Sequence, residues 1–178
     1  MHKIIGGFSK KCNYIFKLGR AEMKDDVLKK MTYGVYVVST WDKGRPTGCA
    51  ANSVMQISDS PVTIAISINR KHYTHKCIEE CKKFAVSVLS EKTSMQTIGI
   101  FGFQSGATVD KFEQVDYFIK NHMPVLTQCC GYLTCELIEK LETSTHTIFL
   151  GKVTEGEVLE NAEAMTYQYY QKEIKGKR

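Results

Sequence analysis

The pattern of apolar and polar positions predicts a chain built mainly from β-strands. In VTIAISI (62–68), large apolar side chains alternate with small ones, which is the period of a strand. VYVVSTW (35–41) and GCAANSVMQIS (48–58) are further strand-like runs. DKGRP (42–46) separates these two runs and is typical of a turn, so it predicts a hairpin.

The rest of the chain repeats this pattern and adds short helices. FAVSVL (84–89) predicts another strand, and 132–142 with 146–159 predicts a long hairpin that turns at TSTH (143–146). Strands joined by tight turns favour an antiparallel barrel or sandwich over a sheet of βαβ units. Helices are expected at 23–31, 73–83 and 91–102.

Length and composition are those of a globular domain. The chain has 178 residues, of which 43 % are apolar, enough for one domain with a sizeable core. No apolar run approaches the roughly 18 residues of a membrane span, so we expect no membrane anchor. Seven cysteines, an odd number, without an export signal, favour reduced thiols and a cytoplasmic location.

The net charge of +5 comes from the first twenty residues. They contain five basic residues and no acidic one, whereas the two signs balance in the rest of the chain. The body therefore gives no reason to expect nucleic acid as a partner. The same segment lacks the continuous apolar stretch of a signal peptide. We expect 1–22 to be a basic N-terminal extension, or the product of an upstream start, and 23–178 to be the functional domain.

The stretch ISINRKHYTH (66–75) is the first candidate for a binding site. Arg70 and Lys71 supply cations, and Thr74 stands at the predicted start of a helix. Helix starts have unpaired N–H groups and a positive dipole end, which attract phosphate. A capped helix with solvated cations also explains this segment, and capping is the commoner arrangement.

Small residues on two predicted strands add to this candidate. Gly48, Ala50 and Ala51 lie in the run 48–58, and Thr63, Ala65 and Ser67 alternate with isoleucines in 62–68. Such faces leave room for a planar ring, with its phosphate at the helix start. Close strand packing in a tight barrel also requires small residues.

Six segments occur in an order and spacing that are specific together. They are MTYGVYVVST, GCAANSVMQIS followed by Pro61, INRKHYTH, FAVSVLS, FGFQSGATVDKF and HTIFLGKV. This order resembles the flavin reductase-like family of FMN-binding split barrels, with flavoredoxin-like proteins and rubredoxin-fused flavin domains as the nearest members. The resemblance covers the chain between about residues 25 and 170 and implies a mainly β fold: an antiparallel Greek-key split β-barrel with short flanking helices.

The resemblance also implies a homodimer with non-covalent FMN at its interface. Asn52, Ser53 and Val54 would contact the isoalloxazine ring or the ribityl chain. The residues around the phosphate end would be Ser67, Asn69, Lys71 and Thr74.

Two further residues would serve the reaction. Lys111 would approach the cofactor from the loop 103–112, where a cation favours the reduced flavin. His146 would lie near the reactive face, where the nicotinamide of NADH or NADPH arrives. A C-terminal aromatic segment would cover the pocket, in one chain or across the dimer, through Tyr167, Tyr169 and Tyr170.

The implied function is that of an FMN-dependent oxidoreductase. Hydride from NADH or NADPH would pass through FMN to free flavin, ferric iron or a redox protein such as rubredoxin. One alternative is a non-enzymatic FMN carrier, flavoredoxin-like, that a partner protein reduces. Another is a split barrel that binds haem, or nucleic acid through its basic tail.

The chain departs from the family pattern at several positions. Ser53 stands where many relatives have a bulky aromatic residue, so ring stacking is expected to differ. Ala107 and Thr108 replace an arginine and an acid that relatives often have. No rubredoxin-like CxxC pair follows the barrel, so an iron centre is expected on a partner.

No metal site is expected. His72, His75, Cys77 and Cys81 fall within one short segment, but their spacing matches none of the common zinc patterns. The adjacent pair Cys129-Cys130 is either buried or redox-reactive, since a bridge between neighbours would be strained.

Overall fold

The computed structural model describes residues 25–28 and 30–175. The expected extension 1–22 and Cys12 lie outside the described residues. Of the helix expected at 23–31, the structure describes a turn at Asp25–Leu28. In chain order the elements are α2 (Asp25–Leu28), β1 (Tyr36–Asp42), β2 (Arg45–Ala51), β3 (Val54–Asp59), β4 (Val62–Asn69), α3 (Tyr73–Cys81), β5 (Lys83–Val88), α4 (Met95–Phe103), the 3-10 turn η1 (Phe112–Gln114), β6 (Tyr117–Lys120), β7 (Met123–Leu126), β8 (Gly131–Glu142), β9 (His146–Val158), α5 (Tyr167–Tyr169) and the π-turn η2 (Tyr170–Ile174).

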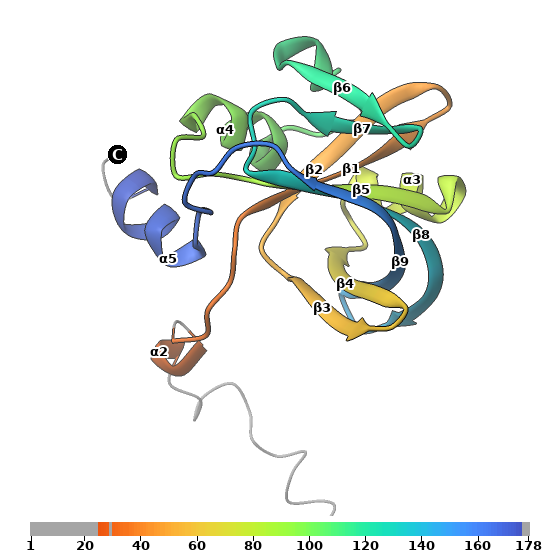
Figure 1. Ribbon diagram of the computed structural model, residues 1–178, viewed down its shortest axis with the longest axis horizontal. Coiled ribbons are helices and arrows are strands. Elements are labelled where there is room, and N and C mark those ends of the chain that lie inside the picture. The colour runs from red at the N-terminus through yellow and green to blue at the C-terminus, as the bar shows by residue number, and fades with distance from the viewer. Residues whose placement is uncertain (1–24, 29, 176–178) are drawn as a thin grey trace, which may run out of the picture. The chain divides into compact units, whose positions relative to one another are not determined.

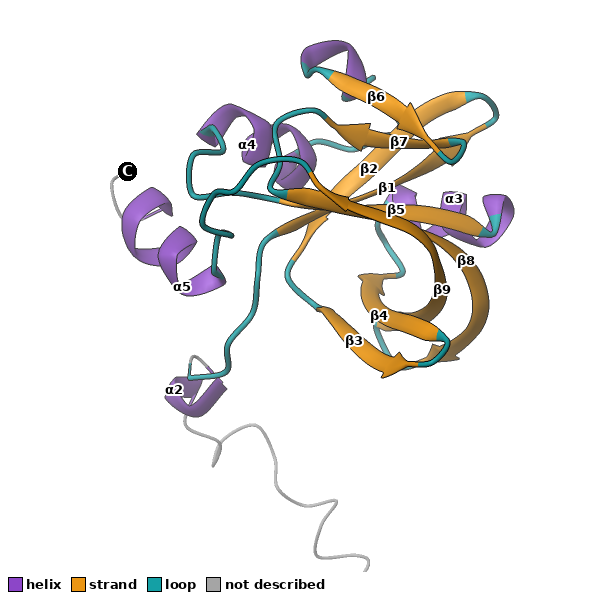
Figure 2. Ribbon diagram, viewed as in Figure 1, coloured by secondary structure: helices purple, strands orange, loops and turns teal. Residues whose placement is uncertain are grey.

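Seven strands form one antiparallel sheet in the order β2-β1-β5-β8-β9-β4-β3, and β6 and β7 form a separate hairpin. Figure 2 shows that strands dominate and that the helices are short. β2 and β3 lie at opposite edges of the sheet, although only Asn52 and Ser53 separate them in the chain. A link of that length spans roughly 10 Å, so the two edges must approach each other. The curl of β8, β9, β4 and β3 in Figure 1 brings them together, which confirms the split barrel expected from the sequence.

The prediction of one continuous strand over 48–58 was wrong. The chain leaves β2 at Ala51 and enters β3 at Val54, and it changes partners from β1 to β4 in between. The Ser67 amide donates to the Ser53 carbonyl at 3.0 Å, which fixes this connection beside β4. The two strands were predicted as one because the link between them, Asn52-Ser53, contains no Gly or Pro that would indicate a break.

Two other features differ from the sequence-based expectation: the start of α4 and the hairpin β6–β7. α4 begins at Met95 because the Ser94 hydroxyl accepts a hydrogen bond from the Thr97 amide at 3.1 Å and caps the helix. The hairpin β6–β7 was not predicted. Its turn residues Asn121 and His122 have φ values of 44° and 63°. Asparagine adopts such positive φ values more readily than most residues, so Asn121 was the sequence signal that could have located the turn.

Three apolar clusters fill the two faces of the sheet. The barrel interior contains Ile66, Phe84 and Phe149, each with an exposed fraction of 0 %. The outer face of β1 packs against α4 through Val37, Ile98 and Phe101. A third cluster lies under the β6–β7 hairpin: Ala85, Met123, Val125 and Tyr132.

β1 supplies side chains to both faces of the sheet. Val38 points into the barrel interior beside Ile78 of α3, whereas Val37 faces α4. Consequently α3 and α4 pack against β1 and β2 from two directions. Their ends meet near Cys49 of β2, and that meeting point is the candidate site.

The cysteines of the described part are all free thiols: Cys49, Cys77, Cys81, Cys129, Cys130 and Cys135. Cys129 and Cys130 are both buried, and burial raises the pKa of Cys129 to about 11. Of the two alternatives for this pair, buried or redox-reactive, the structure therefore favours the buried one, because a buried protonated thiol is a poor nucleophile. None of the described helices is long and apolar enough to span a membrane.

Gly151 of β9 marks the closest packing across the barrel. A Cβ atom there would lie 2.4 Å from Phe84 Cζ and 2.9 Å from the Cys135 Cβ. The phenyl ring is fully buried and Cys135 belongs to β8, so neither neighbour has room to move. A side chain on β9 at this point would separate the strands that close the barrel.

We therefore expect Gly151→Ala to destabilise the protein by about 1–3 kcal/mol, the usual cost of overpacking. Gly99 is the matched control, because a Cβ on this α4 residue meets nothing within 4 Å. Gly99→Ala should stabilise by roughly 0.4–1 kcal/mol through the unfolded chain. Urea unfolding of both variants measures the difference, and equal midpoints would contradict the packing argument.

Candidate functional site

A pocket of about 210 Å³ opens between the start of α3 and the end of α4. Three residues expected at the cofactor, Lys71, Thr74 and Lys111, line it together. Cys49 of β2 is a further lining residue, and the 102–106 segment forms the opposite wall. The complete lining is Cys49, Lys71, His72, Tyr73, Thr74, Phe101, Gly102, Phe103, Gln104, Ser105, Gly106 and Lys111.

The first turn of α3 forms one wall of the pocket. His72 is the N-cap residue, and its side chain accepts no capping hydrogen bond. The His75 amide donates to the His72 carbonyl at 3.0 Å, so the N–H groups of this turn that remain for an anion are those of Tyr73 and Thr74. The Asn69 carboxamide accepts a hydrogen bond from the Lys71 amide at 2.9 Å, which shapes the turn from β4 into the helix. Thr74 follows in the first turn with an exposed fraction of 2 %.

Lys111 is a buried cation at the base of the pocket. Its exposed fraction is 3 %, and its ammonium donates to the carbonyls of Gly48 at 2.9 Å and Phe101 at 3.3 Å. Burial lowers the pKa of Lys111. Both hydrogen-bond partners are neutral, and within the described residues no carboxylate forms an ion pair with this ammonium. Its charge is therefore available to an anionic ligand.

Cys49 lies beside this cation without cancelling its charge. Burial raises the pKa of the Cys49 thiol, while a hydrogen bond with Thr74 and the charge of Lys111 act in the opposite direction. The thiol is thus neutral at physiological pH. The electrostatic character of the pocket is set by its two lysines and by the helix start.

His72 is one of the pocket residues that the sequence analysis did not assign to the cofactor site. It lies at the exposed rim. Partial desolvation of its ring lowers its pKa, and electrostatic interactions with Lys111 and His146 act in the same direction. His72 therefore shares the pocket with Lys111 and lies within electrostatic range of His146. Its position directly before Tyr73 and Thr74, at a helix start, was the available signal.

The other expected residues lie on adjoining strand ends and not in the pocket lining. Ser53 and Ser67 are neighbours through their backbone hydrogen bond, and Asn69 pairs with His146 across β4 and β9. The His72 amide donates to the Asn69 carbonyl at 2.9 Å, which connects these strand ends to the pocket. Asn52 also lies in the β2–β3 link, where its side-chain oxygen accepts from the Ser53 hydroxyl at 3.1 Å.

Val54 and the C-terminal tyrosines lie elsewhere. Val54 packs against the barrel interior. The tyrosines of α5 and η2 pack on the outer cluster with α4, and the rings of Tyr167 and Tyr170 stack at 5.8 Å. In this chain they do not line the pocket. Among the described residues no group of three or more His, Cys, Asp or Glu side chains could hold a metal ion.

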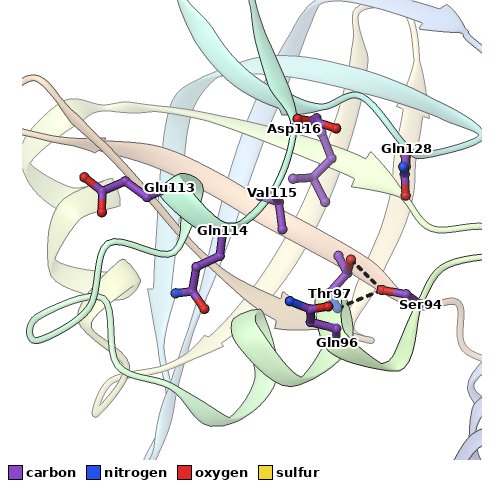
Figure 3. A pocket seen from close by; sticks show the side chains of 9 residues that line it. Ser94, Gln96, Thr97, Glu113, Gln114, Val115, Asp116 and Gln128 are labelled. Carbon is purple, nitrogen blue, oxygen red and sulfur yellow. Dashed lines mark hydrogen bonds between the residues drawn. The ribbon is translucent and has the colours of Figure 1, made fainter.

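A larger hollow of about 350 Å³ lies between the start of α4 and η1 and contains none of the expected residues. Figure 3 shows Ser94, Gln96 and Thr97 on one side of it and Glu113 to Asp116 on the other. Two carboxylates and uncharged polar groups make it unfavourable for a phosphate-bearing ligand. We therefore take the smaller, cationic pocket as the candidate site.

Comparison with known proteins shows the family to which the chain belongs. A family model described as "Flavin reductase like domain" matches residues 28–177. The ferric-chelate reductase (NAD(P)H) of Archaeoglobus fulgidus is 36 % identical over 157 residues, which are 87 % of this chain and 93 % of that protein. The high molecular weight rubredoxin of Moorella thermoacetica is 38 % identical over 156 residues, 86 % of this chain and 68 % of that protein.

A solved structure agrees at the level of the fold. The NADH:FAD oxidoreductase SgcE6 of Streptomyces globisporus superimposes with a TM-score of 0.73 at 28 % identity, covering 79 % of this chain and 83 % of the other. The family match extends over most of the chain and includes every strand of the barrel. The chain therefore belongs to the flavin reductase-like family.

Proposed function

We propose that this protein is an FMN-dependent oxidoreductase that takes hydride from NADH or NADPH and passes electrons to an acceptor. The observation that carries the proposal is the cationic pocket at the uncapped start of α3, in a chain of the flavin reductase-like family. Relatives named ferric-chelate reductase (NAD(P)H) and NADH:FAD oxidoreductase support the use of a nicotinamide donor.

The residues of the pocket fit the phosphate end of FMN. Lys71 supplies positive charge, Thr74 supplies a hydroxyl, and the amides of Tyr73 and Thr74 at the start of α3 supply N–H groups. We propose Ser67 and Asn69 as further phosphate contacts because they end the neighbouring strand. One compact cationic pocket suits a single terminal phosphate, which is why we favour FMN over FAD.

We propose that the isoalloxazine ring lies along the link between β2 and β3. Asn52 and Ser53 are half-buried there, with small polar side chains, and Val54 follows on the strand. When bound, the flavin would supply the redox chemistry itself, and the protein supplies position and charge. Lys111 would stabilise negative charge on the ring, and His146, near His72, would orient the nicotinamide.

We propose that the protein is a homodimer with FMN at the interface. The pocket volume of about 210 Å³ is below the roughly 300–1,000 Å³ of complete ligand pockets. A second chain would complete it. Exposed apolar residues on two strands support such an interface, with exposed fractions of 63 % at Met55 and 62 % at Leu141. The C-terminal tyrosines would then belong to a site formed across the dimer.

The remaining assignments extend the same proposal. We assign 23–178 to the flavin domain and 1–22 to a basic extension outside it. The free thiols of the described part fit a cytoplasmic location. A redox protein such as rubredoxin is a candidate acceptor, beside free flavin and ferric iron, because one relative is named high molecular weight rubredoxin. We propose no nucleic-acid partner and no membrane partner.

The first experiment is an absorbance spectrum of the purified protein before and after anaerobic addition of NADH or NADPH. Flavin bands that bleach on addition would support the oxidoreductase. Bands that persist would favour the second candidate, a flavin carrier reduced by a partner protein. A protein that contains no flavin and takes up none from added FMN would contradict both.

Thr74→Ala should weaken FMN binding by about 1.5–3 kcal/mol, because a hydrogen bond to a charged phosphate is lost. Thr74→Ser retains the hydroxyl and serves as the matched control. Fluorescence titration of the apoprotein with FMN gives both dissociation constants. If the alanine variant binds as tightly as the serine variant, Thr74 does not contact the phosphate.

His146→Ala should slow reduction by NADH or NADPH more than it weakens FMN binding, because the side chain is assigned to the nicotinamide side. Stopped-flow measurement of the bleaching rate, beside the FMN titration, separates the two effects. Thr145→Ala is a suitable control, since it removes the hydroxyl that lies 2.8 Å from the His146 Nδ1 and keeps the imidazole. A reduction rate unchanged in His146→Ala would make this residue structural only.

A further inference from the structure

A cluster of Asp42, Arg45 and Tyr73 connects the two walls of the pocket. The Asp42 carboxylate accepts hydrogen bonds from Arg45 Nη2 at 3.0 Å and from the Tyr73 hydroxyl at 2.9 Å. Arg45 Nη2 also donates to the Gly106 carbonyl at 2.7 Å. Tyr73 is the first residue of α3, and Gly106 lies in the opposite wall, so one guanidinium and one carboxylate bridge both sides.

The β1–β2 hairpin provides the base for this bridge. Asp42 and Arg45 pair with each other across its two-residue turn, Lys43-Gly44, in which both residues have positive φ values of 50° and 90°. A turn of this type is tight and holds the ends of its strands in register. The two charged side chains therefore project from a rigid support, not from a loop.

The opposite wall lies directly against the same hairpin. A Cβ atom on Gly106 would lie 2.3 Å from Thr47 Oγ1 and 3.4 Å from the Tyr73 ring, so only glycine fits this contact. The Thr47 hydroxyl is buried without a hydrogen-bond partner among the described residues. An orphaned buried hydroxyl carries a cost, which indicates that the close approach of this wall is enforced by its other contacts.

The electrostatics keep the bridge intact at neutral pH. The hydrogen bond from Arg45 lowers the pKa of Asp42, although desolvation opposes it. The bond to Asp42 raises the pKa of Tyr73, which therefore keeps its proton. Within the described part of the chain, Asp42 forms no ion pair with any charged side chain other than Arg45. The carboxylate thus serves these two donors.

We propose that Asp42 and Arg45 are positioning residues that set the spacing between the start of α3 and the 102–106 wall, and thereby the affinity for the phosphate of FMN. Neither residue lines the pocket itself. The inference rests on the proposed function, since it concerns the same site. It differs from the phosphate contacts above because it assigns the effect to residues that act through Tyr73 and Gly106.

The test compares Arg45→Met and Asp42→Asn with Glu155→Gln. Glu155 is a matched control, because its carboxylate also accepts from a tyrosine, Tyr132, at 2.8 Å and faces a cation, Lys120, at 3.4 Å. It belongs to β9 and does not line the pocket. Each apoprotein is titrated with FMN and with riboflavin, which lacks the phosphate, and its unfolding midpoint is recorded.

We expect both hairpin variants to bind FMN about ten-fold more weakly, which is the effect of losing one charge-assisted hydrogen bond to the phosphate when the walls move apart. The affinity of both variants for riboflavin, and the affinity of the control variant for FMN, should stay unchanged. FMN affinity equal to that of the wild type would overturn the inference. So would an equal loss for riboflavin, which indicates general damage to the fold. A wild type that binds no FMN would overturn the proposed function, and this inference with it.

Discussion

The two-residue link between β2 and β3 is the constraint on which the rest of the structure depends. Asn52 and Ser53 connect strands that lie at opposite edges of a seven-stranded sheet. A link of that length cannot cross a flat sheet, so the sheet must curl until its edges approach. Closure in turn requires β9 to pass close to Phe84, and Gly151 permits this because it has no side chain.

Closure also determines where the helices lie. Once the barrel interior is filled by Ile66, Phe84 and Phe149, α3 packs at its end through Ile78, and α4 must cover the outer face of β1. The start of one helix and the end of the other then meet over Cys49 of β2. The pocket is therefore a consequence of how both faces of β1 are buried, and the β1–β2 hairpin supports both of its walls.

The charge of the pocket follows from desolvation. Lys111 is buried against two carbonyls, and Cys49 is neutral because burial raises its pKa. The pKa of His72 is lowered by partial desolvation and by electrostatic interactions with Lys111 and His146. No buried carboxylate among the described lining residues offsets the lysine. Such a site favours a ligand that brings negative charge, as a reduced flavin nucleotide would.

The sequence by itself determined most of the strand content, the hairpins that turn at 42–46 and 143–146, and the family, because alternation, turn residues and motif order are local properties. It also indicated Lys71 and Thr74, since a polar segment between a strand and a helix can be recognised within ten residues. Only the tertiary structure decided that 48–58 is two strands, that Lys111 meets Cys49, and that Asp42 and Arg45 bridge to Gly106. These contacts join residues far apart in the chain, and closure of the barrel, not local preference, brings them together.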